Sequence, residues 1–248
     1  MKTELLKGIQ PFWFWNGKME EEEIRRQIRE MADKGIRGFL IHSRQGMEIP
    51  YLTEDYFDRV GVAVEEAKKH GLEVWLYDEY PYPSGVSAGK VMLDHPEYCC
   101  KALTKTVKTV TGPSVLELKA PWGRLLSARA YPVVNGQCDF SEYIDLTDHV
   151  GTGYQEEIFQ LSGLTAYNRK RFFTGVASQY LYWEAPEGEW KVYVFVEEVM
   201  KHFKYFENFV DPLNPEAVRY FIECTHEQYK ARFGDEFGKT IKGVFTDE

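Results

Sequence analysis

The feature that most constrains this chain is a regular alternation of strand-like and helix-like segments over residues 11–85. Three apolar runs, at residues 11–17, 36–44 and 74–77, have the composition of buried strands. Segments with helical periodicity separate them, and the connections are short. Strands and helices that alternate in this way form right-handed βαβ units, so the sequence predicts a parallel sheet.

The two helix-like segments carry start and stop signals. In the first, which begins at about Met19, Ile24, Ile28 and Met31 repeat at the spacing of one helix face. The second is predicted to begin after Thr53, whose hydroxyl can cap a helix, and to stop at Gly71. Both segments therefore have one apolar face to pack against the sheet.

The pattern changes between Ala102 and about Val199, where the helical period disappears. Turn signals such as Gly112-Pro113, Asn135-Gly136 and Pro186-Glu-Gly188 separate short strand-like runs there. Those runs are Thr104–Val110, Val115–Leu118, Leu125–Val134 and Lys191–Glu197. This stretch is predicted to be an all-β insertion after the third strand.

The α/β pattern returns with Asn214 as a helix cap and Pro215 at the first helical position, and Thr240–Glu248 has the composition of a strand. We expect a (β/α)8 TIM-barrel-type fold, present only in its first half, in the front part of a longer protein. The predicted domains are 1–101 and 200–248 in the barrel part and 102–199 in the insertion. A complete doubly wound open sheet is the alternative.

Composition and charge limit the partners. A net charge of −9 disfavours nucleic acid and anionic membranes. No apolar run approaches the roughly 20 residues of a membrane span, and the N-terminus lacks an apolar signal core. Four cysteines without metal-ligand or disulfide-framework spacing suit reduced thiols in the cytoplasm. Neither the charge nor the composition predicts an oligomeric state.

Polar side chains gather where the predicted strands end. They are Asn16, His42, Arg44, Asp78, Glu79, Asp247 and Glu248, and the aromatic residues Tyr80 and Tyr82 follow the third strand. The carboxyl ends of parallel strands meet at one edge of the sheet, so these groups are expected to lie together. Carboxylates accept hydrogen bonds from sugar hydroxyls, and two carboxyl groups on opposite sides of a glycosidic bond can hydrolyse it. The pattern indicates a site for an oligosaccharide or glycoside.

Each of these residues also has a purely structural interpretation. His42 could be a hydrogen-bonded core histidine, and Arg44 could form a surface ion pair. Asp78 and Glu79 could cap the next helix or pair with surface lysines. Asp247 and Glu248 could be ordinary loop acids. No glycine-rich phosphate loop, Gly-x-Ser-x-Gly elbow or His-Glu-x-x-His helix occurs, so nucleotide binding and those two hydrolase types are not predicted. His226-Glu227 is predicted to pack on a helix face or to form a hydrogen bond to a neighbouring loop.

Six short motifs carry a resemblance to a known family. They are Phe12-Trp-Phe-Trp-Asn-Gly17, Phe39-Leu-Ile-His-Ser-Arg44, Tyr77-Asp-Glu-Tyr80 leading to Pro83-Ser-Gly85, Trp183-Glu-Ala-Pro-Glu-Gly-Glu-Trp190, Asn214-Pro-Glu-Ala217 with Thr225-His-Glu227, and Phe245-Thr-Asp-Glu248. With these, the chain resembles the bacterial α-L-rhamnosidase-type barrel hydrolases of glycoside hydrolase family 106 and their relatives. The resemblance implies a two-carboxylate mechanism and adds a bound Ca²⁺ as a cofactor, whereas the residues alone predict no cofactor and no metal ligands.

The sequence therefore predicts the N-terminal portion of a glycoside hydrolase. Glu248 is the first choice as general acid and Glu79 the second, and the remaining strand-end residues would hold substrate hydroxyls. Two other functions stay open. One is a metal-dependent barrel isomerase or lyase acting on sugars. The other is a carbohydrate-binding protein without catalysis.

Overall fold

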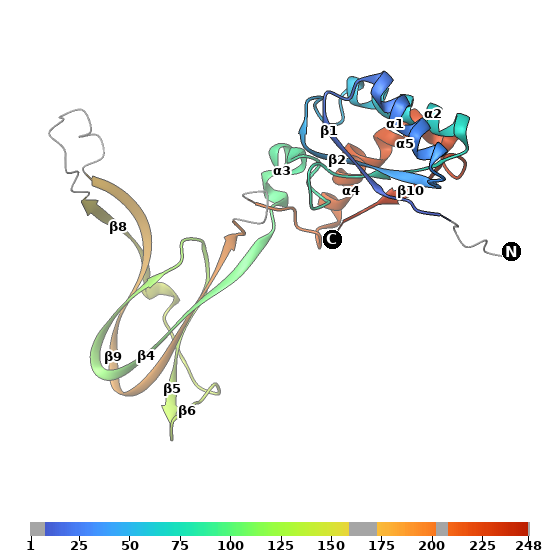
Figure 1. Cartoon of the computed structure of the whole chain (residues 1–248). Coiled ribbons are helices and arrows are strands. Elements are labelled where there is room, and N and C mark those ends of the chain that lie inside the picture. The colour runs from blue at the N-terminus through green and yellow to red at the C-terminus, as the bar shows by residue number, and fades with distance from the viewer. Residues whose placement is uncertain (1–7, 159–172, 202–207, 248) are drawn as a thin grey trace. The chain divides into compact units, whose positions relative to one another are not determined.

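A computed structural model describes residues 8–158, 173–201 and 208–247 of the chain. The chain divides into two compact units, one formed by 1–100 with 201–248 and the other by 101–200. Figure 1 shows the helices gathered in the first unit and the long curved strands in the second. The predicted domain boundaries at 101/102 and 199/200 stay predictions.

The first unit, called the parallel unit below, is an α/β structure. Its elements in chain order are β1 (Phe12–Gly17), α1 (Glu21–Asp33), β2 (Gly38–Met47), α2 (Glu54–His70), β3 (Glu73–Tyr77), α3 (Lys90–Asp94), η1 (Pro96–Tyr98), α4 (Pro215–Cys224), α5 (His226–Phe233), η4 (Gly234–Glu236) and β10 (Ile241–Phe245). The four strands pair in parallel in the order β1-β2-β3-β10. This is the pairing that the strand–helix alternation predicts.

Alternation of side chains along each strand separates the two faces of the parallel sheet. On one face, Phe39, Ile41, Val74, Leu76 and Ile241 form a core with the apolar sides of α1 and α2 and with Tyr229 of α5. Figure 1 shows α1, α2 and α5 together over this face. The opposite positions carry rings: Phe12 and Phe14 are half exposed on β1, and His42, Tyr77 and Phe245 continue the row across the sheet. The first face builds the fold, and the second presents aromatic groups.

Local signals in the helices act as predicted. The side-chain oxygen of Thr53 accepts a hydrogen bond from the amide of Tyr56, and Gly71 ends α2 in the left-handed conformation. Asn214 caps α4 through the amide of Glu216. α4 ends at Thr225, where the backbone leaves the helical conformation at φ −120°, and α5 begins at His226. The Thr225 hydroxyl donates to the carbonyl of Phe221 at 2.8 Å.

The prediction of a (β/α)8 TIM-barrel-type fold is wrong for this structure. Among the described residues the parallel strands number four and form an open sheet with β1 and β10 at its two edges. The remaining strands form a separate antiparallel sheet, so the chain combines one parallel and one antiparallel sheet. Alternating strands and helices specify parallel pairing of neighbours, but they specify neither the number of strands nor closure into a barrel.

The second unit, called the antiparallel unit below, is built from long strands. Its elements are β4 (Lys101–Ala120), β5 (Arg124–Val134), β6 (Gln137–Cys138), β7 (Ile144–Asp145), η2 (Thr147–His149), β8 (Val150–Ile158) and β9 (Phe173–Val199). β9 pairs with β4, β5 and β8, all antiparallel. Leu181, Val192, Val194 and Val196 of β9 pack with Ala128, Ala130 and Leu146 in an apolar core.

The predicted turn at Asn135-Gly136 is confirmed, because both residues have positive φ and join β5 to β6. The turns predicted at Gly112-Pro113 and at Pro186-Glu-Gly188 do not reverse the chain. Both lie within long strands, where the register between β4 and β9 shifts after Gly112. A side chain at Gly112 would overlap the carbonyl oxygen of Pro186, so this close approach of two backbones requires glycine.

No helix among the described residues is both long enough and apolar enough to cross a membrane. The predicted cytoplasmic location stays a prediction.

Candidate active site

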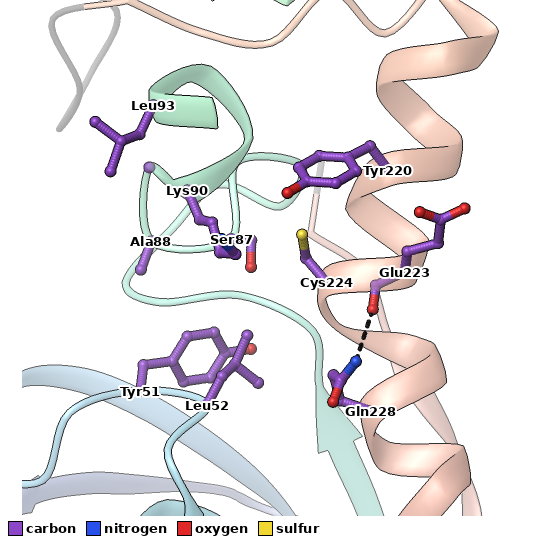
Figure 2. Close-up of a pocket in the computed structure, with 11 residues that line it drawn as sticks. Tyr51, Leu52, Ser87, Ala88, Lys90, Leu93, Tyr220, Glu223, Cys224 and Gln228 are labelled. Atoms are coloured by element: carbon purple, nitrogen blue, oxygen red, sulfur yellow. Dashed lines mark hydrogen bonds between the residues drawn. The ribbon is translucent and has the colours of Figure 1, made fainter. Parts of the chain in front are cut away.

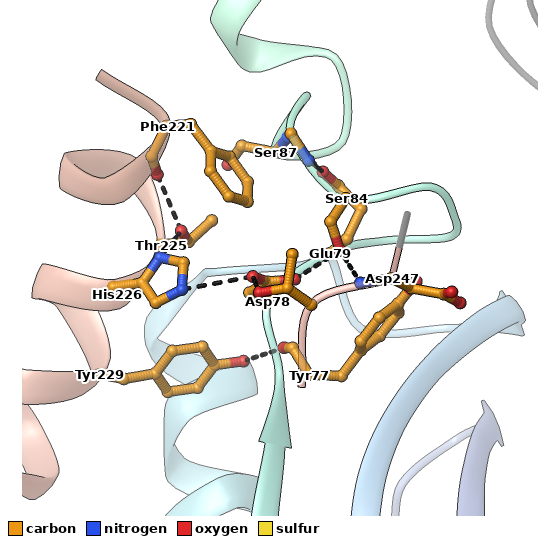
Figure 3. A network of polar contacts seen from close by, with 12 residues as sticks. Tyr77, Asp78, Glu79, Ser84, Ser87, Phe221, Thr225, His226, Tyr229 and Asp247 are labelled. Carbon is orange, nitrogen blue, oxygen red and sulfur yellow. Dashed lines mark hydrogen bonds and ion pairs between the residues drawn. The ribbon is translucent and has the colours of Figure 1, made fainter. Parts of the chain in front are cut away.

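Asp78 organises the carboxyl edge of the parallel sheet. It follows β3 directly, its side chain is fully buried, and Figure 3 shows it at the centre of a polar network. Ser84 Oγ donates to Asp78 Oδ1 at 2.6 Å, and Thr246 Oγ1 donates to Oδ2 at 2.6 Å. His226 Nε2 lies 3.3 Å from the same Oδ2. A buried carboxylate is stable only when its oxygens are paired in this way, so Asp78 fastens together the ends of β3 and β10 and the start of α5.

Buried hydroxyl groups form a series of hydrogen bonds next to this edge of the sheet. Tyr229 OH donates to the carbonyl oxygen of Tyr77 at 3.3 Å and lies 2.8 Å from Tyr56 OH. Tyr56 OH is in turn 3.1 Å from Ser43 Oγ. Burial raises the pKa of both tyrosines, so these phenols stay neutral and serve as hydrogen-bonding links. The links fix β2, β3, α2 and α5 relative to one another.

Glu79 is also fully buried, and its carboxylate holds the loop between β3 and α3. Both oxygens accept backbone N–H groups at 2.7–3.1 Å, and the donors are the amides of Tyr80, Gly85, Val86, Ser87 and Ala88. Burial raises the pKa of Glu79 to about 7, and the amide hydrogen bonds act in the opposite direction. Because both carboxylate oxygens of Glu79 accept hydrogen bonds from amides of its own loop, the structure favours a structural role for this residue. Its predicted catalytic role stays a prediction.

His42 and Asp247 lie at the same edge, outside the hydrogen bonds of Asp78 and Glu79. His42 is buried, with 3% of its surface exposed, whereas Asp247 is half-buried. The His42 ring stacks on Tyr77 with centroids 4.0 Å apart, and Phe12 and Phe14 meet it edge-on. His42 Nδ1–H donates to the carbonyl of Ser43 at 3.2 Å. Burial lowers the pKa of His42 and the Arg44 guanidinium adds to this, whereas Asp247 acts in the opposite direction. The neutral imidazole is therefore favoured, with Nε2 as an acceptor.

Asp247 is half-buried, and its backbone is fixed by the Asp78 network. Its amide donates to Ser84 Oγ at 2.9 Å, and its carbonyl accepts the amide of Ser84 at 3.0 Å. The Asp247 carboxylate has no hydrogen-bond or ion-pair partner among the described residues, although its charge acts on His42 and Tyr77. A rigid backbone therefore carries an unpaired carboxylate at the edge of the sheet.

The structure brings only some of the predicted site residues together. His42, Asp78 and Asp247 converge around Tyr77, and Glu79 lies directly behind them. Arg44 lies over the ring of Phe14, 5.0 Å from its centroid, on the same face as His42.

The remaining predicted residues lie elsewhere. Asn16 is exposed and lines a separate cavity of about 290 Å³ beside Trp13 and α1. Tyr80 stacks on Tyr51 at 5.8 Å, and Tyr82 is half-buried in the loop. Glu248 lies outside the described residues.

Sequence reasoning missed three members of the network. Ser84, Thr246 and His226 all contact Asp78. The sequence predicts for His226 only packing on a helix face or a hydrogen bond to a neighbouring loop, not a place in the site. For His226 a signal was available. Thr225 and His226 interrupt an otherwise amphipathic helix, and the break puts the imidazole Nδ1 2.9 Å from Thr225 Oγ1. Ser84 lies in the motif Pro83-Ser-Gly85, but the motif does not show that its hydroxyl binds Asp78.

The described residues contain no group of three or more His, Cys, Asp and Glu side chains placed to hold a metal ion. The Ca²⁺ implied by the family resemblance is untested and stays a prediction, as does the metal-dependent alternative.

Comparison with known proteins gives a similarity in structure. No model of a known protein family matches the chain, and no curated protein matches its sequence. Among solved structures, the chain is similar to a rhamnosidase from Novosphingobium sp. PP1Y, with a TM-score of 0.50 at 14% identity. The similarity covers 96% of this chain and 38% of the rhamnosidase, so the chain spans well under half the length of that protein. At this identity the comparison shows a shared fold.

Proposed function

We propose that this chain forms part of a glycoside hydrolase and supplies one wall of its saccharide site. The observation that carries the proposal is the unpaired Asp247 carboxylate beside the neutral His42 ring, at the carboxyl edge of a parallel sheet. The shared fold with a rhamnosidase supports the same class of protein. A rhamnosidase-like specificity is the finer form of the proposal.

The chemistry of this edge suits a neutral sugar. Asp247 can accept hydrogen bonds from sugar hydroxyls, and His42 Nε2 can accept another, while the rings of Phe12 and Phe14 offer apolar surface to the C–H side of a sugar. Both rings are about half exposed, at 51% and 50%. Saccharides combine hydroxyl groups with apolar ring faces, so this edge complements both kinds of surface.

The residues divide into contact and positioning roles. Asp247 and His42 are the proposed substrate contacts, and Arg44 borders them through Phe14. Asp78 and Glu79 are positioning residues, because their oxygens are used within the protein. Glu248 stays the proposed general acid, on the grounds of its sequence position after the strand-end Asp247.

Two substitutions test the proposal through hydrolysis of glycosides. Glu248→Gln is expected to lower kcat/KM on oligosaccharides by about 10²–10⁴-fold, and clearly less on an aryl glycoside whose acidic phenol leaves without protonation. Asp247→Asn is expected to lower kcat/KM on both substrates by roughly 10–100-fold, because the charged hydrogen bond to a hydroxyl is weakened. The exposed Asp235→Asn serves as control. Equal losses for the two substrates in Glu248→Gln, with a lowered melting temperature, would reject the general-acid role.

The hydrogen bonds that Glu79 accepts from its own loop favour a second candidate function. Because this carboxylate is occupied by five amides, the described residues offer one unpaired carboxylate at the edge rather than two. A carbohydrate-binding protein without catalysis needs only that one. Saccharide binding that is lost in Asp247→Asn, without turnover of any aryl glycoside, would establish this alternative.

A further inference from the structure

A second cavity lies beside the loop that Glu79 holds. It measures about 880 Å³ and is bordered by the loop and α3 on one side, by α4 and α5 on another, and by Tyr51 and Leu52 (Figure 2). Its volume is in the range of small-molecule sites. None of its lining residues belongs to the group formed by His42, Asp78 and Asp247, so it is a different place in the parallel unit.

The wall of this cavity contains a buried hydroxyl without a partner. Ser87 is 2% exposed, and its Oγ has no hydrogen-bond partner among the described residues. The backbone of Ser87 has φ 52° and that of Ala88 φ 54°, a conformation that costs energy for residues other than glycine. Glu79 compensates, because it binds the amides of both residues. The loop is thus held in a strained shape that leaves a polar atom unsatisfied.

An unsatisfied buried hydroxyl normally costs free energy, which a bound ligand would recover. Gln228 lines the same cavity, and one of its amide N–H groups donates to the carbonyl of Glu223 at 3.2 Å. Its second N–H has no partner among the described residues and can donate to a ligand. The cavity therefore offers the Ser87 hydroxyl, the Gln228 amide and the exposed Glu223 carboxylate.

The charge and apolar surface of the cavity narrow the ligand class. Lys90 Nζ pairs with Asp94 at 2.5 Å, and the hydroxyl of Tyr220 donates to the same carboxylate at 2.6 Å, so this cation is neutralised within the protein. Leu93, 80% exposed, and Leu52 supply apolar surface at the rim. A ligand for this cavity carries no net negative charge, bears hydroxyl groups and has an apolar face.

We propose that this cavity is a second saccharide site, which binds one or two neutral sugar units through Ser87 and Gln228. The inference rests on this cavity alone and does not require that the chain hydrolyses a glycosidic bond. It assigns to Glu79 the role of a positioning residue, which fixes the backbone that presents the Ser87 hydroxyl.

The test is an NMR titration of the 248-residue protein, labelled with ¹⁵N, with L-rhamnose and in parallel with D-glucose. Saturable shifts are expected for the amides of Ala88, Gly89 and Lys90 and for the side-chain amide of Gln228. Ser87→Ala is expected to weaken binding about five- to tenfold, the size of one neutral hydrogen bond. Because the Ser87 hydroxyl has no partner in the protein, the same substitution should leave the melting temperature unchanged or raise it.

Two further variants make the outcome decisive. Gln228→Ala is expected to weaken binding to a similar extent, and Ser141→Ala, an exposed serine of the antiparallel unit, should have no effect. Absence of saturable shifts around the cavity with both sugars would overturn the inference. So would shifts confined to His42 and Asp247, a result that would at the same time support the proposed function, so the failures of the two proposals are distinguishable.

Discussion

The parallel and antiparallel units of this chain differ in how many polar side chains they bury. Of the polar and charged side chains that are buried in the described residues, all except Ser178 lie in the parallel unit. In the antiparallel unit the core is made of aliphatic and aromatic side chains, and acids such as Glu197 form ion pairs at the surface. Buried and oriented polar groups are typical of functional sites, so the contrast favours the parallel unit for the proposed site.

The same contrast predicts how each unit responds to substitution. A buried charge that is fully hydrogen-bonded is costly to disturb, since its partners are left unsatisfied. An apolar core loses only the transfer free energy of the removed atoms and the cost of the cavity. Substitutions in the two units and the pH dependence of unfolding can test this difference in cost.

Removal of the Glu79 carboxylate should have the largest effect. Glu79→Ala leaves five loop amides without their acceptor, so we expect the free energy of unfolding to fall by roughly 3–5 kcal/mol at pH 8. Urea unfolding measures this free energy. Glu22→Gln, at an exposed position of α1, is the control. A loss below about 1 kcal/mol would show that the loop keeps its shape without Glu79.

The pH dependence of stability should show an intermediate effect. Burial raises the pKa of Glu79 to about 7 from its ordinary value of 4.5, so the folded chain binds this proton more tightly than the unfolded chain. The resulting stabilisation is fully present below about pH 4.5 and is lost as the pH rises through about 7, with an upper limit of about 3 kcal/mol.

His42 acts in the opposite direction in part of this range, because burial lowers its pKa and the folded chain then disfavours its protonation. The measurement is therefore the difference between the pH profiles of urea unfolding for the wild-type protein and for Glu79→Gln. We expect the difference to change between pH 4.5 and 7. A constant difference would mean that the five amides keep Glu79 ionised throughout.

A core substitution in the antiparallel unit should have the smallest effect. Val194→Ala removes two methyl groups from a fully buried side chain of β9, so we expect the free energy of unfolding to fall by roughly 2 kcal/mol. The loss should not vary with pH, because the core around Val194 contains no titratable group among the described residues. Saccharide titration of this variant should match the wild-type protein. A changed affinity would show that the sites depend on the antiparallel unit.

Much of the local structure was predictable from the sequence. The cap at Thr53, the left-handed stop at Gly71 and the hairpin turn at Asn135-Gly136 depend on the conformational preferences of single residues, which act without distant partners. Parallel pairing of the four strands followed from the alternation of strands and helices. The meeting of His42, Asp78 and Asp247 followed from their positions at strand ends.

Tertiary structure decided what those side chains do. Asp78 and Glu79 are neighbours with the same chemistry. Asp78 meets Ser84, Thr246 and His226, whereas Glu79 faces the amides of its own loop. The sequence pattern also could not predict whether the parallel sheet closes into a barrel. Closure depends on how many strands pair and not on any one βαβ unit. Sequence spacing sets which element carries a residue, but the free energy of a buried charge depends on the atoms within hydrogen-bonding distance, and folding alone brings those atoms together.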